Sequence, residues 1–245
     1  LAWHYMQGIG VLRNFPEADR LYREAYELGV RGAAVNLAAL YRKGGAGIDQ
    51  NYAESVFWAK RAADAGNPRG QNILGELIRD GRGIRQSFQG ALELFELAAA
   101  KRLPAAEYNA SAVLRNGVGV KRDEKKAMVY LKRAAGAGHA AAMVDLGLAY
   151  AEGNGVAKST KTSIQWFRKA ARKSPASAMA LARAHEQGVF GKPDLVRAYM
   201  WFTVAAKKGR VEGRIASAAV GRQLTKAQKD QANRLAKDWL SGKTS

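Results

Sequence analysis

Apolar residues recur along the chain at helical spacing, and the whole pattern returns about every 36 residues. Within 33–43, Leu37, Leu40 and Tyr41 lie three and four residues apart, which puts them on one face of an amphipathic helix. A second stretch of each unit carries a bulky pair four residues before Ala-Ala, as Trp166-Phe167 does before Ala170-Ala171. Each unit is therefore predicted to be a pair of helices.

One small residue per unit sets the register of the repeat. Six of them are separated by 37, 36, 36, 36 and 35 residues: Ala18, Ser55, Ala91, Ala127, Ser163 and Ala198. A single helix pair cannot bury its own apolar face, so neighbouring units must stack to complete the core. The pattern predicts an αα-solenoid.

A turn with two glycines separates the helices of each unit. Glycine ends a helix in the left-handed conformation without a Cβ penalty, so these turns are predicted to reverse the chain. Five follow a Gly-x-Gly-Val-like pattern, at 8–11, 45–48, 81–84, 117–120 and 153–156, and the sixth, at 188–191, is irregular.

The repeated unit resembles the Sel-one-like repeat family, a relative of tetratricopeptide repeats. The resemblance is carried by strings such as Leu146-Gly147-x-x-Tyr150-x-x-Gly153-x-Gly155-Val156, followed by Trp166-Phe167-x-Lys169-Ala170-Ala171. It covers residues 1–209 and implies an all-α fold, a right-handed αα-superhelical solenoid of six helix-pair repeats. In this family the first helices line the concave surface and the second helices the convex one.

Two junctions depart from the family pattern. The consensus glycine that closes the second helix is present as Gly29, Gly66, Gly138 and Gly209. Arg102 and Ser174 replace it in the other two units, and a proline follows each of them shortly. We expect these two junctions to turn by a different geometry.

The first repeat is predicted to be incomplete. Leu1-Ala2-x-x-Tyr5 matches Leu37-Ala38-x-x-Tyr41, which places Leu1 in the middle of a first helix. We therefore expect the natural protein to continue upstream of Leu1.

Residues 210–245 are predicted to cap the solenoid with two helices and a tail. The stretch 211–221 gives a helix of small residues. Thr225 and Gln228 have capping-box spacing at the start of a last helix, which is predicted to bury Leu235 and Trp239. Such a cap keeps its Lys and Arg side chains outward, as the end of a solenoid requires.

Composition and charge restrict the partner more than the fold. The 245 residues are 47% hydrophobic and 25% charged, as in ordinary globular proteins, and no apolar run approaches the ~18 residues of a membrane span. The 40 Lys and Arg against 21 Asp and Glu give a net charge of +19. An acidic partner is expected, whether protein, nucleic acid or anionic lipid.

The positive charge is sorted by element. The first-helix windows 33–43, 70–80, 106–116, 142–152 and 177–187 hold five cations and six anions, so the excess lies on second helices and connections. A nucleic-acid interface could use those cations, but no interleaved aromatics or reader motif is evident in the sequence. A solvated basic surface is the favoured interpretation.

The sequence offers no catalytic or metal-binding motif, so no enzyme and no cofactor is predicted. There is no Cys, and His4, His139 and His185 fall in different units without ligand spacing. His185 takes the position of Tyr41 and Tyr150, so it is predicted to be a packing residue, whereas His139 begins a helix as a surface residue. Absence of Cys leaves the redox compartment open.

The glycine pairs are interpreted as structural rather than as phosphate loops. A dinucleotide fingerprint needs a strand before it, whereas these turns connect two helices and recur in every unit. Gly242-Lys243-Thr244 resembles the end of a Walker A motif but lacks the upstream glycine.

The candidate partner-binding residues lie on first helices, opposite the core stripe, and are expected to face solvent. They are Trp3, Gln7, Asn36, Lys43, Glu76, Asp80, Asn109, Asn116, Asp145, Leu148, Glu152, Arg183 and Gln187. Exposed Trp3 and Leu148 would suit a protein contact, since aromatics are common interface hot spots. Trp3 could equally be covered by an upstream unit.

The leading hypothesis is a non-catalytic module that binds one acidic protein through the concave groove and basic edges. The resemblance implies a bacterial adaptor, an envelope regulator or an antagonist of secreted effectors, and it favours the periplasm over the cytoplasm. A sharper version is an immunity protein that neutralises a type VI secreted toxin such as a phospholipase. The alternatives are a cell-envelope regulator or scaffold, and nucleic-acid binding through the basic convex face.

Overall fold

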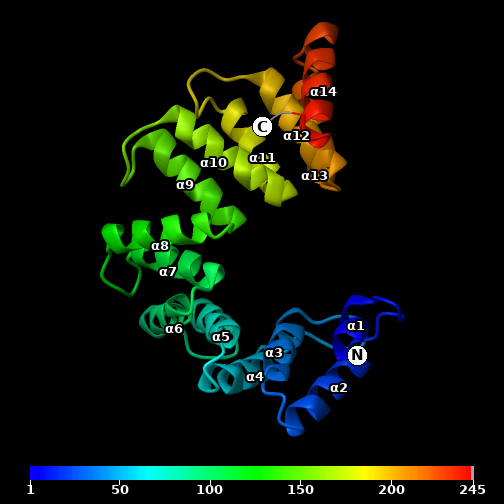
Figure 1. Ribbon diagram of the computed structural model, residues 1–245, viewed down its shortest axis with the longest axis vertical. Coiled ribbons are helices and arrows are strands. Elements are labelled where there is room, and N and C mark those ends of the chain that lie inside the picture. The colour runs from blue at the N-terminus through cyan, green and yellow to red at the C-terminus, as the bar shows by residue number, and fades with distance from the viewer. Residues whose placement is uncertain (244–245) are drawn as a thin grey trace. The chain divides into compact units, whose positions relative to one another are not determined.

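The computed structural model describes residues 1–243, which form helices joined by short turns (Figure 1). The chain of helices confirms the all-α prediction, and the described residues add one isolated bridge between Gly45 and Ile48. In order, the helices are α1 (Ala2–Gln7), α2 (Phe15–Glu27), α3 (Ala33–Lys43), α4 (Tyr52–Asp64), α5 (Pro68–Asp80), α6 (Phe88–Ala100), α7 (Pro104–Asn116), α8 (Glu124–Gly136), α9 (Ala140–Glu152), α10 (Thr160–Lys173), α11 (Pro175–Glu186), α12 (Leu195–Lys207), α13 (Val211–Gly221) and α14 (Lys226–Leu240).

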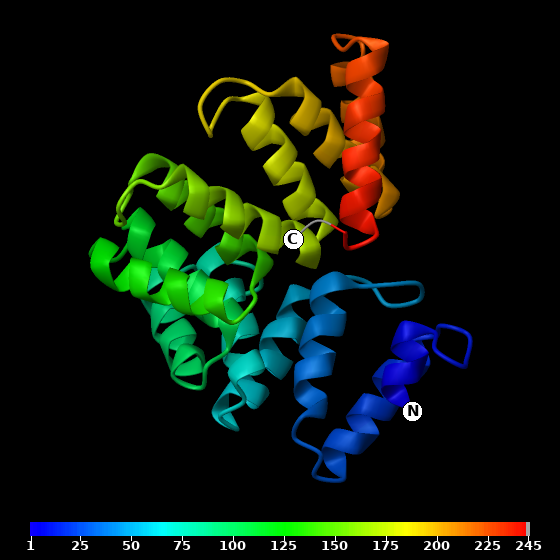
Figure 2. The same ribbon diagram turned by 45° about the horizontal axis from the view of Figure 1, so that its top comes forward.

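The chain divides into two compact units. Unit 1 is Leu1–Tyr130 and unit 2 begins at Leu131, so the boundary falls inside α8. Within each unit a helix packs against its neighbours along the chain, such as α3 on α4 and α5 on α6 in unit 1. In unit 2, α9 packs on α10 and α11 on α12 (Figure 1, Figure 2). Contacts are therefore local in sequence, as expected for stacked helix pairs.

The small residues that set the register of the repeat lie where the two helices of each repeat pack against each other. Ala127 is 3% exposed, and the other five are fully buried. The hydroxyl of Ser55 donates to the carbonyl of Ala38 at 2.8 Å, and that of Ser163 to the carbonyl of Gly147 at 2.6 Å. These bonds satisfy the buried hydroxyls within the helix pair.

Glycine on the first helix makes room for the buried phenylalanine of the second. A Cβ on Gly75 would lie 2.6 Å from the Phe95 ring, and one on Gly147 would lie 2.8 Å from Phe167. Both rings are at most 1% exposed. Gly75 and Gly147 therefore mark positions where the two helices of a pair approach closely.

The glycine turns are confirmed, with one correction. Gly117 ends α7 at φ 65° and ψ 18°, the left-handed cap that the pattern predicts. In the second repeat the first turning glycine is Gly44, at φ 68°, and not Gly45 as predicted from the 45–48 pattern. This turn contains one extra residue, and Gly45 instead pairs with Ile48 in the isolated bridge.

The two unusual junctions differ from each other. Arg102 has φ 59°, so it keeps the left-handed turn of the consensus glycines, and the prediction of a different geometry there was wrong. Ser174 is extended, with φ −150° and ψ 135°, which confirms the prediction for that junction. Ser174 ends α10 and also caps α11, because its hydroxyl accepts from the amide of Ala176 at 3.2 Å.

The last two helices pack on α12. The capping box is present, with Thr225 and Gln228 each accepting from the other's backbone amide. Trp239 is buried as predicted, and Leu235 is half-buried against the same core. Among residues 1–243, no helix has both the length and the apolar character needed to cross a membrane.

Candidate partner-binding face

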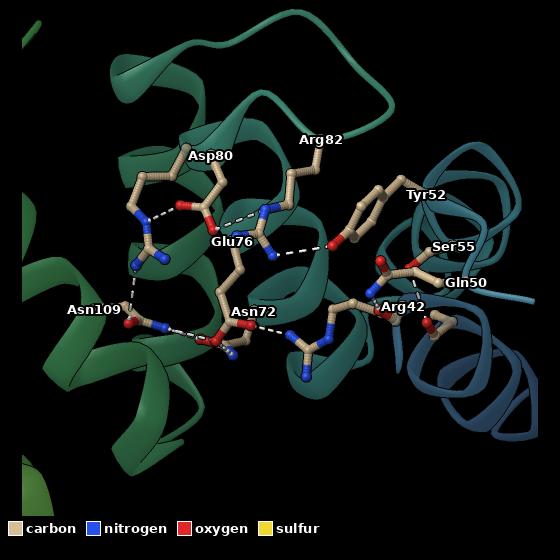
Figure 3. A network of polar contacts seen from close by, with 11 residues as sticks. Arg42, Gln50, Tyr52, Ser55, Asn72, Glu76, Asp80, Arg82 and Asn109 are labelled. Carbon is tan, nitrogen blue, oxygen red and sulfur yellow. Dashed lines mark hydrogen bonds and ion pairs between the residues drawn. The ribbon is translucent and has the colours of Figure 1, made fainter. Parts of the chain in front are cut away.

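A polar network joins the first helices of consecutive repeats in unit 1 (Figure 3). Arg42 near the end of α3 pairs with Glu76 of α5. Glu76 Oε1 also accepts from the side-chain amides of Asn72 at 2.9 Å and Asn109 of α7 at 3.1 Å. Asn109 in turn donates to Asn72 Oδ1 at 2.9 Å. The network therefore spans α3, α5 and α7.

A second arginine repeats the arrangement one unit later. Arg79 of α5 occupies the repeat position of Arg42, and it donates to Asn109 Oδ1 of α7 at 3.4 Å and to Asp80 at 2.8 Å. Arg115 stands at the same position in α7. We call the face formed by Arg42, Asn72, Glu76, Arg79, Asp80 and Asn109 the polar ladder.

Side chains of the turns extend the polar ladder. Gln50 donates to the backbone carbonyl of Arg42 at 2.8 Å, and Gln86 donates to that of Arg79 at 2.7 Å. Both glutamines therefore satisfy carbonyls of the last turn of a first helix. Arg82 donates to the Tyr52 hydroxyl at 3.2 Å and lies 3.9 Å from Asp80 (Figure 3).

A small cleft of about 230 Å³ opens beside the polar ladder. It is lined by Arg79 and Asn116 together with the apolar side chains of Phe88, Ala112 and Val118. Val118 is 54% exposed, so apolar surface is accessible there. This combination of apolar and polar lining residues suits a protein or peptide side chain.

Most of the predicted binding residues reach solvent. Eight are exposed: Trp3, Gln7, Lys43, Asp80, Asn116, Glu152, Arg183 and Gln187. Four are half-buried: Asn36, Glu76, Asp145 and Leu148. Lys43, Asp80 and Asn116 end α3, α5 and α7 in succession; Asp80 belongs to the polar ladder, and Lys43 and Asn116 border it.

Two of these predictions were wrong about exposure. Asn109 is buried, because it faces α5, where the side chains of Asn72 and Glu76 accept hydrogen bonds from its side-chain amide. Leu148 packs against the core of unit 2 rather than standing out from the surface. Trp3 is 49% exposed and touches His4 edge-on, so it is the apolar candidate that stays accessible.

Arg42, Arg79 and Asn72 were not among the residues predicted from the sequence. The recurrence of arginine at 42, 79 and 115 was a signal that could have found the first two. Asn72 carried no such signal, because the repeat does not place asparagine at that position in α3 or α7.

Comparison with known proteins identifies the family. The model of the Sel1 repeat matches residues 1–30, 32–67, 68–102, 104–139, 140–174 and 175–209, and each matched segment holds one helix pair. The chain belongs to the Sel1 repeat family. Sel1 repeat proteins mediate protein–protein interactions, and the repeat is typically a non-catalytic interaction module.

Three solved structures show the same fold. A Sel1 repeat protein from Oxalobacter formigenes is 30% identical, with a TM-score of 0.74, over 84% of this chain and 85% of that one. A putative Sel1 repeat protein from Klebsiella pneumoniae is 22% identical, with a TM-score of 0.57, over 83% and 99%. The immunity protein Pa5087 from Pseudomonas aeruginosa is 21% identical, with a TM-score of 0.56, over 75% and 67%. A search of the curated proteins found no match.

Two of the three histidines of this Sel1 repeat chain, His139 and His185, have structural roles. His185 is 5% exposed with its ring 4.8 Å from that of Phe190, which confirms the packing prediction. Burial lowers the pKa of His185 to about 4, so it is neutral at pH 7. His139 caps the start of α9 by accepting from the Ala142 amide at 3.3 Å, which confirms that it begins a helix, but it is half-buried rather than a surface residue. Within residues 1–243, no group of three or more His, Asp or Glu could hold a metal ion.

Part of the basic excess of this Sel1 repeat chain is structural. Lys208 donates to the carbonyl of Ala171 at 3.0 Å, and Lys101 donates to that of Gly66. Each lysine therefore reaches the carboxyl end of the preceding second helix, where a positive charge is favourable.

Aromatic rings do accompany the cations, contrary to the sequence prediction. The Arg61 guanidinium lies 3.5 Å from the centroid of Phe57, and Lys169 lies 4.6 Å from that of Trp166. The pairs are four and three residues apart on one helix, a spacing that the repeat pattern did not make visible.

Proposed function

We propose that the chain binds one partner protein through the polar ladder of unit 1 and acts as an immunity protein that neutralises a secreted toxin. The observation that carries the binding proposal is the linkage of three first helices by Arg42, Glu76, Asn109 and Arg79. Side chains fixed between repeats lose little freedom when a partner docks. The face is therefore prepared for binding.

The exposed residues in and beside the polar ladder favour a specific contact over one that depends on net charge alone. Lys43 is positive, Asp80 negative and Asn116 neutral, and Asn116 opens onto the cleft beside Phe88. Such a mixed surface selects a partner by matched hydrogen bonds and charges. The net charge of +19 acts at longer range and speeds the encounter with an acidic protein.

The immunity role is supported by fold similarity and by charge. One structure with this fold is the immunity protein Pa5087. A bacterial chain with a strongly basic surface would associate rapidly with an acidic toxin, such as a phospholipase delivered by type VI secretion. An envelope regulator or scaffold would use the same face for a different acidic protein.

The test is affinity capture with wild-type protein and two tryptophan variants. Bacterial lysate and secreted protein are passed over each at about 0.15 M and then about 0.5 M salt, after nuclease treatment, because the higher salt screens non-specific charge attraction. Asn116→Trp fills the cleft beside the ladder. Asn233→Trp makes the same change at an exposed position of α14 and is the matched control.

We expect one protein to stay bound at high salt to the wild type and to Asn233→Trp, and to be lost from Asn116→Trp. That protein should be toxic when expressed alone and harmless when the wild-type chain is co-expressed. A retained protein without toxicity would refute the immunity role and leave the interaction module. Retention that is equal for all three proteins would refute the placement of the site on the polar ladder.

A further inference from the structure

Arg168 of α10 is a half-buried cation held against an aromatic ring. Its guanidinium carbon lies 5.2 Å from the centroid of Trp239 in α14. No carboxylate among residues 1–243 comes within 4.0 Å of it. Partly desolvated cations usually have an anionic partner, so Arg168 is unusual.

The ring under Arg168 is rigidly placed. Trp239 is 6% exposed, and its ring centroid lies 4.7 Å from that of Trp201 in α12. The guanidinium carbon of Arg172, one turn along α10, also lies 4.7 Å from the Trp239 centroid. Stacking orients the Arg168 guanidinium while its N–H groups stay available at the edge of its plane.

The surroundings of Arg168 are strongly positive. Burial, followed by the charges of Arg172 and Arg197, lowers the pKa of Arg168. No Asp or Glu occurs between Glu152 and Glu186, whereas seven cations do: Lys158, Lys161, Arg168, Lys169, Arg172, Lys173 and Arg183. Acidic residues do occur on the neighbouring elements. Asp194 lies 3.6 Å from Arg197, α9 contributes Asp145 and Glu152, α11 contributes Glu186, and α14 contributes Asp230 and Asp238.

We call Arg168, Lys169, Arg172 and Arg197 the arginine face, in which Arg168 and Arg172 lie over the ring of Trp239. We propose that the arginine face binds an acidic segment of a protein, with Arg168 holding a carboxylate through paired N–H···O bonds. A planar guanidinium fork matches a carboxylate in this way. The face belongs to second helices of unit 2, so the inference does not depend on the function proposed for the polar ladder.

The rings of this region favour a protein over single-stranded nucleic acid. Base stacking needs an open aromatic face, whereas Trp239 is buried and Lys169 lies over Trp166. A membrane surface is also disfavoured. No large hydrophobic side chain between Val129 and Val211 is exposed, so nothing there could insert into lipid.

The experiment measures binding of a fluorescein-labelled octaglutamate peptide by anisotropy at about 0.05 M salt. Arg168→Gln is compared with Arg61→Gln, which removes the same charge from a stacked but exposed arginine of unit 1. We expect Arg168→Gln to weaken binding about tenfold and Arg61→Gln less than about twofold, because exposed charges contribute little. Arg168→Lys keeps the charge without the planar fork and should fall between them.

Circular dichroism and melting curves show whether each variant folds, and Arg168→Lys carries the test if Arg168→Gln does not. Equal weakening by Arg168→Gln and Arg61→Gln would overturn the proposal, since only net charge would then matter. The proposal is also overturned if a 12-base-pair duplex or phosphatidylglycerol vesicles bind more tightly than octaglutamate and with the same dependence on Arg168. Asn116→Trp should leave octaglutamate binding unchanged, which separates this test from that of the polar ladder.

Discussion

Replacing Arg102 by glycine should stabilise the protein, although it removes a whole side chain. Arg102 is the one residue other than glycine with positive φ in the described chain, at 59°. The corresponding junctions carry Gly66, Gly138 and Gly209, with φ between 72° and 94°. The turn therefore demands a left-handed residue, and arginine meets that demand with strain.

The magnitude follows from two opposing terms. A residue with a Cβ costs about 1–2 kcal/mol in the left-handed conformation. Glycine loses more freedom on folding, by roughly 0.5–1 kcal/mol. The side chain of Arg102 is exposed and makes no ion pair within residues 1–243, and the backbone bond from its amide to the Ala99 carbonyl is kept. The expected net gain is about 0.5–1 kcal/mol.

Thermal and urea unfolding, followed by circular dichroism, would measure the gain. For a chain of this size about 1 kcal/mol raises Tm by roughly 2–4 °C. Gly29→Ala is the matched control, because Gly29 has φ 91° and an added Cβ would meet nothing within 4 Å. It should lower stability by about 1 kcal/mol. A lower Tm for Arg102→Gly, or a higher one for Gly29→Ala, would refute the reasoning.

Two further predictions concern the core. Gly75→Ala should lower the free energy of unfolding by about 1–3 kcal/mol, because the new Cβ would lie 2.6 Å from the Phe95 ring. In the control, Gly136→Ala, the new Cβ meets nothing within 4 Å, and stability should change by less than about 1 kcal/mol. Equal urea midpoints for the two variants would contradict this prediction. The pKa of His185 falls from 6.5 to about 4 on folding. Between these two pH values the unfolded chain binds a proton at His185 and the folded chain does not, so acid favours unfolding. The free energy of unfolding should therefore be highest above pH 6.5 and drop by roughly 3 kcal/mol as the pH falls to 4. His185→Tyr should remove that contribution, and an unchanged pH slope in urea unfolding would count against it.

The helices are predicted well from the sequence because the residues that repeat are those that pack between helices. The position of Ala91 and Ser163 must hold a small residue because two helices meet there, and the same requirement applies in every unit. Arg102 shows the limit of this reasoning. A residue type indicates only which backbone conformation that residue prefers. Arginine disfavours the left-handed conformation, yet the turn at Arg102 forms as in the other repeats, with the Ala98 carbonyl accepting from the Leu103 amide at 3.3 Å.

The candidate site is predicted less completely. Helical periodicity gives the direction of a side chain around its own axis, and it placed Asp80 and Asn116 at the surface correctly. It gives no distance to the next helix, so it could not show that α5 covers Asn109. Arg42 and Arg79 were missed for the same reason, since their partners belong to a different repeat.

The two proposed binding faces occupy positions that packing leaves free. Packing fixes the buried residues of both helices, such as Gly147 and Phe167, but it constrains the outward positions only weakly. In unit 1 those positions on the first helices carry a ladder of mixed charge, whereas α10 in unit 2 carries cations without a single Asp or Glu. The polar ladder and the arginine face share no residue and belong to different units. We expect Asn116→Trp to impair retention of the partner protein and to spare octaglutamate binding, and Arg168→Gln to do the reverse.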